Sequence, residues 1–185
     1  MPHLSEAQIQ RYSRQILLKE VGGRGQGLLL SRPVQVVNGG PVFSVAAAYL
    51  VAGGSPLRLG PEVVLDGFLE GVSLGDFNPD VAGPGEPWLT LSWGVVAADT
   101  PAAVAVGEGV SFHGPDGCRA CFARTSALLG QGRLAPVDVV GLGSLVALVV
   151  QRLILGRAET LGALRLVDQI PRSVELSRCP RHEGL

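Results

Sequence analysis

The chain has 185 residues, of which 46% are apolar and 17% charged, and it contains 26 glycines and 13 prolines. This composition is typical of a compact, loop-rich globular domain and excludes a disordered or coiled-coil chain. A count of 15 basic against 16 acidic residues gives a formal charge of −1. No broad basic field therefore attracts nucleic acid or an anionic membrane, and we expect neither as a partner.

The first predicted element is an amphipathic helix over residues 5–20. Ser5 and Gln8 have the spacing of a capping box, and apolar residues then recur at helical spacing up to Leu17. The glycines within residues 22–27 predict a flexible loop after the helix.

The start of the chain lacks the basic stretch and apolar segment of a secretory signal, so we expect a cytoplasmic location.

A strand, a glycine turn, a helix and a second strand follow within residues 33–60. We expect a buried strand at Val34–Val37, a helix at Ser44–Val51 and the second strand at Leu57–Leu59. Such a βαβ unit has a right-handed crossover in nearly all known cases. The sequence therefore predicts an α/β fold in a single domain over residues 1–185, with a Rossmann-like, mostly parallel sheet flanked by helices.

The patterns that follow are weaker, and residues 60–87 lack periodicity and are interpreted as loop. The elements expected beyond them are candidate strands at Trp88–Trp93, Val95–Ala98 and Val110–His113, a buried helix within Pro136–Gly156, and a final hairpin of Leu164–Val167 and Val174–Leu176 with Pro171 in its turn. The uncharged apolar run of that helix is shorter than the roughly 20 residues needed to cross a membrane.

Two pairs of metal-ligand residues stand in the C-terminal half of the chain. Cys118 and Cys121 form a C-x-x-C pair, Cys179 and His182 form a C-x-x-H pair, and together they use every cysteine. Each pair presents two ligands to one tetrahedral zinc ion, and four protein ligands leave no open position for catalysis. The sequence predicts a structural zinc that fastens the C-terminal tail, giving a zinc-stapled half over residues 110–185.

Several segments match, in order, the pattern of a known family. They are Leu4-Ser5, Arg11–Leu17, Val34–Gly54, Cys118–Cys121, Gly143-Ser144-Leu145 and the Cys179–His182 pair. On these segments the chain resembles the ThiF/MoeB/HesA family of adenylating enzymes, which are related to ubiquitin activators. The resemblance implies a dimer that uses ATP and magnesium to adenylate the C-terminal glycine of a ubiquitin-like modifier or sulfur carrier, with a structural zinc.

The match is poorest at the phosphate-binding loop, which in that family reads G-x-G-G-x-G after the first strand. Here Asn38, Gly39 and Gly40 are followed by Pro41 and then Phe43, and only Gly40 stays in register. Pro41 has no amide proton, and Phe43 places a ring where close backbone approach is needed. We therefore expect a degenerate loop that does not bind ATP and magnesium in the family manner.

Other nucleotide-binding residues implied by the resemblance are displaced or missing. The ribose-binding acid falls on Glu62 by spacing, or on Asp66 in a slipped alignment, and both alternatives stay open. No lysine follows Lys19 to contact the triphosphate, and Asp99 is the nearest candidate for the magnesium-binding acid. The chain thus resembles a shortened and degenerate member of the family.

Three further features have a functional and a structural interpretation. Arg14 matches an arginine that in relatives crosses the dimer interface to the partner's ATP; the alternative is a solvated helix residue. His113 is interpreted as a structural residue and not as a base. The glycines of Gly141–Ser144 are interpreted as permitting close helix packing and not as a second phosphate loop.

Together these observations favour a non-catalytic relative, or pseudoenzyme, of ubiquitin-like-protein activating enzymes that serves as a zinc-stabilised interaction or scaffold subunit. Its expected partners are a second copy or an active paralogue, and a ubiquitin-like protein, sulfur carrier or peptide. One alternative is an active ATP-dependent adenylyltransferase that has rebuilt its site around Asp66 or Glu62 and a dimer mate's Arg14. Another is a module that binds a different small ligand at the strand ends.

Overall fold

The computed structural model describes residues 3–61, 63, 78–81, 85–96, 99–130 and 134–182, so the candidate ribose acids Glu62 and Asp66 lie outside the described residues. The elements are α1 (Glu6–Arg11), α2 (Ser13–Ile16), α3 (Gly22–Ser31), β1 (Val34–Val36), α4 (Pro41–Ala52), β2 (Leu57–Leu59), the 3-10 turn η2 (Pro79–Val81), β3 (Leu89–Trp93), β4 (Ala102–Val106), β5 (Gly109–His113), α6 (Arg119–Ala127), α7 (Pro136–Ile154), β6 (Leu161–Val167) and β7 (Ile170–Ser173).

These seven strands form one sheet in the order β2-β1-β3-β4-β5-β6-β7. Strands β2, β1, β3 and β4 are parallel, whereas the pairs from β4 to β7 are antiparallel. The antiparallel part arises because short turns join β4 to β5 and β6 to β7, and such turns cannot make a parallel crossover. The fold is therefore α/β and Rossmann-like, but the expected parallel order holds for only half of the sheet.

Helices α4 and α7 cover one face of the sheet. They pack on alternate strand side chains such as Val36, Leu91 and Val104, each at most 1% exposed. Close packing requires Gly143, because a Cβ there would lie 2.6 Å from the Val45 Cβ and 2.8 Å from the Val42 carbonyl oxygen. This confirms that the small residues of α7 serve helix packing.

Among the described helices, α7 is the one long and apolar enough to cross a membrane by length and composition. Half of its most apolar stretch is buried inside the protein. A core helix passes the same test of length and composition, so this is weak evidence for a membrane span.

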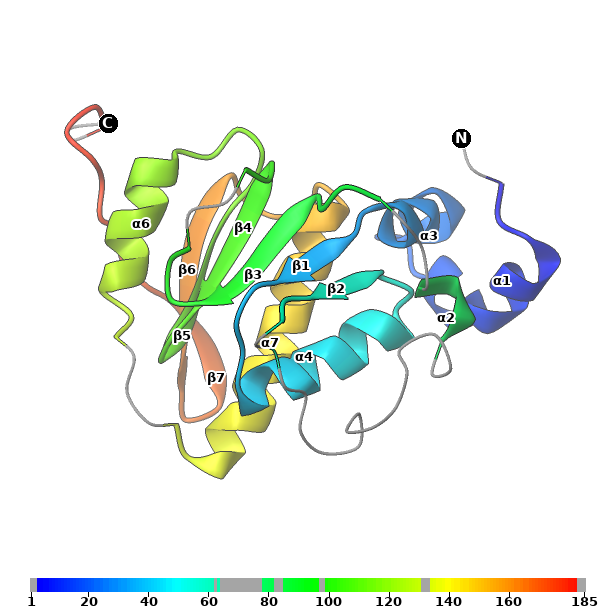
Figure 1. The fold of residues 1–185 in the computed structure, drawn as a ribbon, viewed down its shortest axis with the longest axis horizontal. Coiled ribbons are helices and arrows are strands. Elements are labelled where there is room, and N and C mark those ends of the chain that lie inside the picture. Colours follow the sequence, from blue (N-terminus) through cyan, green and yellow to red (C-terminus); the bar gives the residue numbers. More distant parts are fainter. Residues whose placement is uncertain are drawn as a thin grey trace.

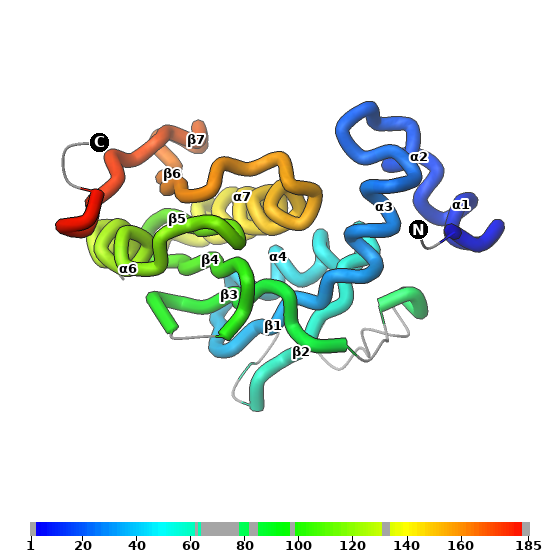
Figure 2. Tube along the Cα trace, turned by 90° about the horizontal axis from the view of Figure 1, so that it is seen from above, coloured from blue at the N-terminus to red at the C-terminus, as the bar shows by residue number. Residues whose placement is uncertain are grey.

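The opposite face of the sheet is covered by α6, where Phe122 packs against Ala103 and Ala105. Figure 1 shows α6 and the C-terminal tail at one end of the molecule and α1, α2 and α3 at the other. The view from above in Figure 2 gives the same arrangement. The N-terminal helices and the C-terminal tail are thus separated by the width of the sheet.

The helix expected over residues 5–20 is in fact two helices, although its capping box at Ser5 and Gln8 is confirmed. The break falls at Tyr12, whose ring is only 2% exposed. Asn78 Nδ2 donates to the Tyr12 hydroxyl at 2.9 Å, and burial raises the pKa of Tyr12 to about 12. The helix is interrupted where this ring turns into the core. The spacing of apolar residues in the sequence does not reveal such a break.

The flexible loop expected at the glycines of residues 22–27 is wrong, because α3 spans Gly22–Ser31. A Cβ on Gly25 would lie 2.9 Å from a methyl carbon of Leu155. Arg32 also donates to the Ile154 carbonyl oxygen at 2.6 Å. At Gly25 the missing side chain lets α3 approach the end of α7, so this glycine serves packing rather than flexibility.

The C-terminal half holds further differences from the expected elements. Strand β4 and helix α6 were not expected, and Val95 and Val96 lie outside any strand. The final hairpin exists, but its turn is Asp168-Gln169, with φ values of 51° and 63°. Two positive φ values match the twist of a tight hairpin. Pro171 therefore lies in β7, and residues 174–176 follow the hairpin.

Candidate functional site

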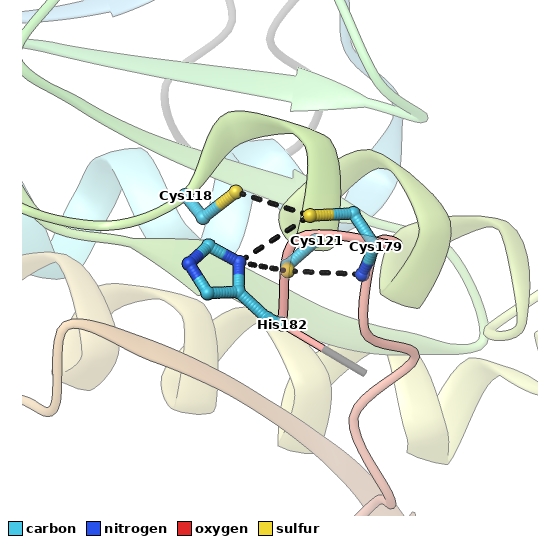
Figure 3. Close-up of side chains that lie close together, drawn as sticks. All are labelled: Cys118, Cys121, Cys179 and His182. Carbon is cyan, nitrogen blue, oxygen red and sulfur yellow. Dashed lines mark hydrogen bonds between the residues drawn. The ribbon is translucent and has the colours of Figure 1, made fainter. Parts of the chain in front are cut away.

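Four predicted ligands come together where the C-terminal tail meets α6. Cys118 is the N-cap residue of α6, and Cys121 lies in its first turn. Cys179 and His182 lie in a tail turn in which the His182 amide donates to the Cys179 carbonyl oxygen at 2.7 Å. Figure 3 shows the four side chains pointing toward one another, and their ligand atoms all lie within 4.8 Å.

The distances between these atoms suit a zinc ion. The Sγ atoms of Cys118 and Cys179 are 3.8 Å apart, and His182 Nδ1 is 3.3 Å from the sulfurs of both Cys121 and Cys179. A tetrahedral ion with Zn–S near 2.3 Å and Zn–N near 2.0 Å places two sulfurs about 3.8 Å apart and sulfur and nitrogen about 3.5 Å apart. The cluster could hold zinc with four protein ligands.

Backbone amides donate hydrogen bonds to the sulfurs of Cys118 and Cys121. The Cys121 amide donates to the Cys118 sulfur, and this is the main reason that the Cys118 pKa is lowered to about 6. The Cys179 amide donates to the Cys121 sulfur at 3.2 Å and lowers its pKa, but burial and the neighbouring thiols outweigh this and raise it overall. Since zinc binds thiolates, an ionised Cys118 favours ligation at neutral pH.

Hydrogen bonds next to the metal ligands also hold the tail. The Ser177 amide donates to Thr125 Oγ1 at 3.0 Å, and that hydroxyl donates to the Ser177 carbonyl oxygen at 3.4 Å. Thr125 is fully buried in α6. Further back, the Val174 amide donates to the Ala163 carbonyl oxygen at 2.9 Å. A metal ion held by the four residues would add to this attachment of the tail.

At the carboxyl ends of β1 and β3, the side chain of Asn38 joins the two strands. The Trp93 amide donates to Asn38 Oδ1 at 2.7 Å, and Asn38 Nδ2 donates to the Trp93 carbonyl oxygen at 3.3 Å. Strand β1 has β2 on one side and β3 on the other, which makes this the point where the strand order reverses. Open α/β sheets bind ligands at such a point.

The N-terminus of α4 offers few amides to a phosphate. Gly40 is its N-cap, Pro41 has no amide proton, and the Phe43 amide donates to the Gly40 carbonyl oxygen at 2.8 Å. The expectation for the Phe43 ring was wrong, because it is buried in the core beneath the loop. A Cβ on Gly39 would lie 3.2 Å from that ring. The loop is therefore built around Phe43.

Arg14 and Asp99, two further predicted residues, lie outside the loop at residues 38–40. Arg14 is exposed on α2, at the end of the molecule opposite the metal ligands, and has no hydrogen-bond or ion-pair partner within the described ranges. Asp99 lies 3.8 Å from Arg119 of α6, in an exposed ion pair. Neither residue is joined to the loop at residues 38–40.

His113 lines a cavity of about 470 Å³ together with Asp99, Arg119 and Phe122. The His113 side chain is 3% exposed, and its Nδ1 lies 2.9 Å from the Gly114 carbonyl oxygen. Its ring meets Phe122 edge to face at 4.8 Å. Burial lowers the His113 pKa, Arg119 adds to this effect, and the bond to Gly114 opposes it. The ring is therefore neutral at neutral pH.

We expect this buried histidine to make the protein less stable in mild acid. The His113 pKa is ordinary, near 6.5, in the unfolded chain and lower in the folded one, so the unfolded state binds more protons below that pH. The free energy of unfolding must then fall as the pH drops through this window. Urea titrations between about pH 5 and 8 measure the slope, which His113→Asn should flatten. Equal slopes in both proteins would contradict the prediction.

The chain is similar to known proteins in part of its sequence and in its fold. No family model matches the chain. Over 63 residues, or 34% of its length, it is 46% identical to the SAMP-activating enzyme E1 of Haloferax volcanii, and the matched part spans 22% of that enzyme. The fold is similar to that of PaaA, with a TM-score of 0.63, 18% identity, and coverage of 96% of this chain and 76% of PaaA.

The fold is also similar to that of E. coli MccB crystallised with AMPCPP and MccA. The TM-score is 0.61 at 16% identity, over 96% of this chain and 73% of MccB. The chain therefore has the ThiF/MoeB-like fold and a local sequence match to an E1 enzyme, which confirms the resemblance seen in its sequence.

Proposed function

We propose that the protein is a non-catalytic relative of ubiquitin-like-protein activating enzymes and acts as a zinc-stabilised interaction or scaffold subunit. The observation that carries this proposal is the bridge from Asn38 to the Trp93 backbone, beside a helix that starts with Pro41. Polar groups at the strand ends bond to each other, and the helix offers few amides to an anion. A chain that keeps the fold but lacks the amides that hold a phosphate is better suited to binding a partner than to catalysis.

The metal ligands support the same proposal. Cys118, Cys121, Cys179 and His182 would hold zinc, which when bound supplies a cross-link and no open position for a substrate. Such a cross-link fixes the shape of the end formed by α6 and the tail. A subunit that presents a surface to a partner benefits from this rigidity.

We propose a partner at the N-terminal end as well, either a second copy or an active paralogue. Ile9, Leu17 and Leu18 are 50%, 85% and 54% exposed there. A group of exposed apolar side chains is typical of an interaction surface. Arg14 lies among them on α2 and would be donated to a partner's site. A monomeric mass in solution at tens of micromolar protein would contradict the dimer.

The further partner is proposed from the relatives. MccB was crystallised with MccA, and the Haloferax enzyme is named for activating SAMP. For this chain we propose a ubiquitin-like protein, a sulfur carrier or a peptide, bound in the cytoplasm. Capture with tagged protein, followed by a binding curve with each candidate alone, identifies the class.

The decisive test is binding of ATP. We expect calorimetry with ATP and magnesium, on protein of measured zinc content, to show no binding up to millimolar nucleotide. E. coli MccB, which was crystallised with ATP, serves as the positive control in the same buffer. A double variant, Asn38→Gly with Pro41→Gly, removes the side-chain hydrogen bonds to Trp93 and gives residue 41 an amide proton. ATP binding by this variant would show that Asn38 and Pro41 prevent binding in the unaltered chain. Micromolar affinity in the unaltered chain would overturn the proposal.

Two alternatives have their own tests. An active adenylyltransferase would use Asp66 or Glu62 for the ribose and Arg14 of a dimer mate for phosphate, and it would exchange pyrophosphate into ATP with a carrier protein present. A small-ligand module is favoured by the cavity at His113, whose Nε2 has no hydrogen-bond partner in the described part of the chain. Mass spectrometry of the denatured protein would then find a copurified ligand.

A further inference from the structure

We propose that Cys118 is a peroxide modification site and that its oxidation forms a disulfide with Cys179. A covalent bond would then replace the metal in fastening the tail to α6. For the metal-bound state of the protein, the inference rests on the proposed function, in which the cluster of four ligand residues holds zinc. It does not depend on the scaffold role or on the absence of ATP binding.

Exposure selects Cys118 as the sulfur that meets an oxidant first. It lies at the N-cap of α6 and is partly exposed, whereas Cys121 and Cys179 are 1% and 5% exposed. Small oxidants react most readily with accessible thiols.

The sulfur–sulfur distance and the hydrogen bonding select Cys179 as the thiol that attacks the oxidised Cys118. Its sulfur is 3.8 Å from that of Cys118, an approach visible in Figure 3. The sulfurs of Cys121 and Cys179 both lie 3.3 Å from His182 Nδ1, but the Cys121 sulfur also accepts a hydrogen bond from the Cys179 amide. Cys121 is one helical turn from Cys118 and is therefore the competing partner. The hydrogen bond that the Cys121 sulfur accepts favours the link from Cys118 to Cys179 in the tail.

The chemistry needs one molecule of hydrogen peroxide. The Cys118 thiolate attacks one peroxide oxygen, the O–O bond breaks, and a sulfenic acid forms as hydroxide leaves. The Cys179 thiolate then attacks that sulfur, its S–O bond breaks, and a second hydroxide leaves. Each cysteine sulfur has given up one electron, and two protons convert the hydroxides to water. Only Cys121 and His182 remain as ligands, which is too few for a structural zinc site.

The tail would respond differently to oxidation and to simple metal loss. In the reduced, metal-free chain, hydrogen bonds such as those between Ser177 and Thr125 would be left to hold the junction, and these open without breaking a covalent bond. In the oxidised chain, the disulfide spans the same junction between α6 and the tail. The oxidised chain therefore keeps its tail in place after the metal has left.

Trypsin makes the pairing directly readable, because it cuts after Arg119, Arg124, Arg178 and Arg181. Each cysteine falls on a separate peptide. Purified protein is treated with one equivalent of peroxide, alkylated, digested without reductant and analysed by mass spectrometry. We expect the peptide ending at Arg119 to be linked to Cys179–Arg181, with loss of one zinc per chain measured by a chromogenic chelator.

Two variants and an exchange measurement sharpen the result. Cys121→Ser should still form the link, whereas Cys179→Ser should leave a sulfenic acid on Cys118 that dimedone traps. Hydrogen exchange over residues 174–182 should stay slow in the oxidised chain and become fast in reduced chain treated with a chelator. Exchange that is equally fast in both states would overturn the proposed fastening of the tail.

Other products would overturn the proposal. A link between Cys118 and Cys121, a disulfide between two chains, or sulfinic and sulfonic acids without a link would each exclude the assigned pair. The failures of the two proposals are distinguishable. A chain without zinc that forms the expected link contradicts only the metal site, and a zinc-bound chain that does not form it contradicts only the oxidation.

Discussion

Replacing Cys179 with serine is expected to abolish zinc binding and to lower the melting temperature by about 10 °C. Loss of a structural metal is among the few single changes that cost about 4 kcal/mol or more, and in a chain of this size each kcal/mol shifts the melting temperature by about 2–4 °C. The cost is smaller than for a zinc finger, because the sheet has its own core. Elemental analysis and thermal unfolding measure both effects.

The matched control for this variant is His182→Cys, which keeps four ligands and should keep the zinc. A second control is Arg181→Ala, which alters the same exposed tail turn without removing a ligand. If Cys179→Ser binds one zinc per chain and melts with the unaltered protein, the metal site is wrong. If only the His182→Cys variant loses the metal, the spacing from Cys179 does not suit a cysteine ligand at position 182.

Replacing Gly143 with valine is expected to destabilise the protein by about 3 kcal/mol, since overpacking a core costs about 1–3 kcal/mol and sometimes more. The added Cβ would lie 2.6 Å from the Val45 Cβ and 2.8 Å from the Val42 carbonyl oxygen. Because the second contact is with helix backbone, α4 and α7 must move apart. Urea unfolding at neutral pH measures the loss.

Leu148→Ala on the same helix is the control, because Leu148 is 51% exposed and its truncation should change stability little. A Gly143→Ala variant should fall between the two, as it adds the Cβ without the branches. An unchanged unfolding midpoint for Gly143→Val would mean that the two helices are not in close contact.

Local patterns predicted the parts of the molecule that depend on short stretches of sequence. The capping box at Ser5, the strand at Leu57–Leu59 and the helix beginning at Pro136 were all found near their expected positions. The spacing within each pair predicted four ligand residues, and the structure brings the two pairs together in a cluster that could hold a metal ion. Spacing was informative there because one ion imposes the same geometry on both turns.

Features that depend on distant partners could not be predicted in this way. Gly25 serves helix packing because of Leu155, far along the chain, so its local signal resembles a flexible loop. Strand β4 is buried at every position and alanine-rich, which removes the alternation that marks a half-exposed strand. The Asn38 bridge needs Trp93, whose position beside β1 follows only from the parallel sheet.

The position of the N-terminal helices and the metal ligands at opposite ends of one sheet has a mechanical consequence. A continuous hydrogen-bonded sheet resists bending, so it acts as a spacer that keeps its two ends at a fixed separation. A molecule held at α1 and α2 does not compete for room with one held at α6 and the tail. If the proposed partners bind at these two ends, the sheet holds both simultaneously with a defined distance and orientation between them.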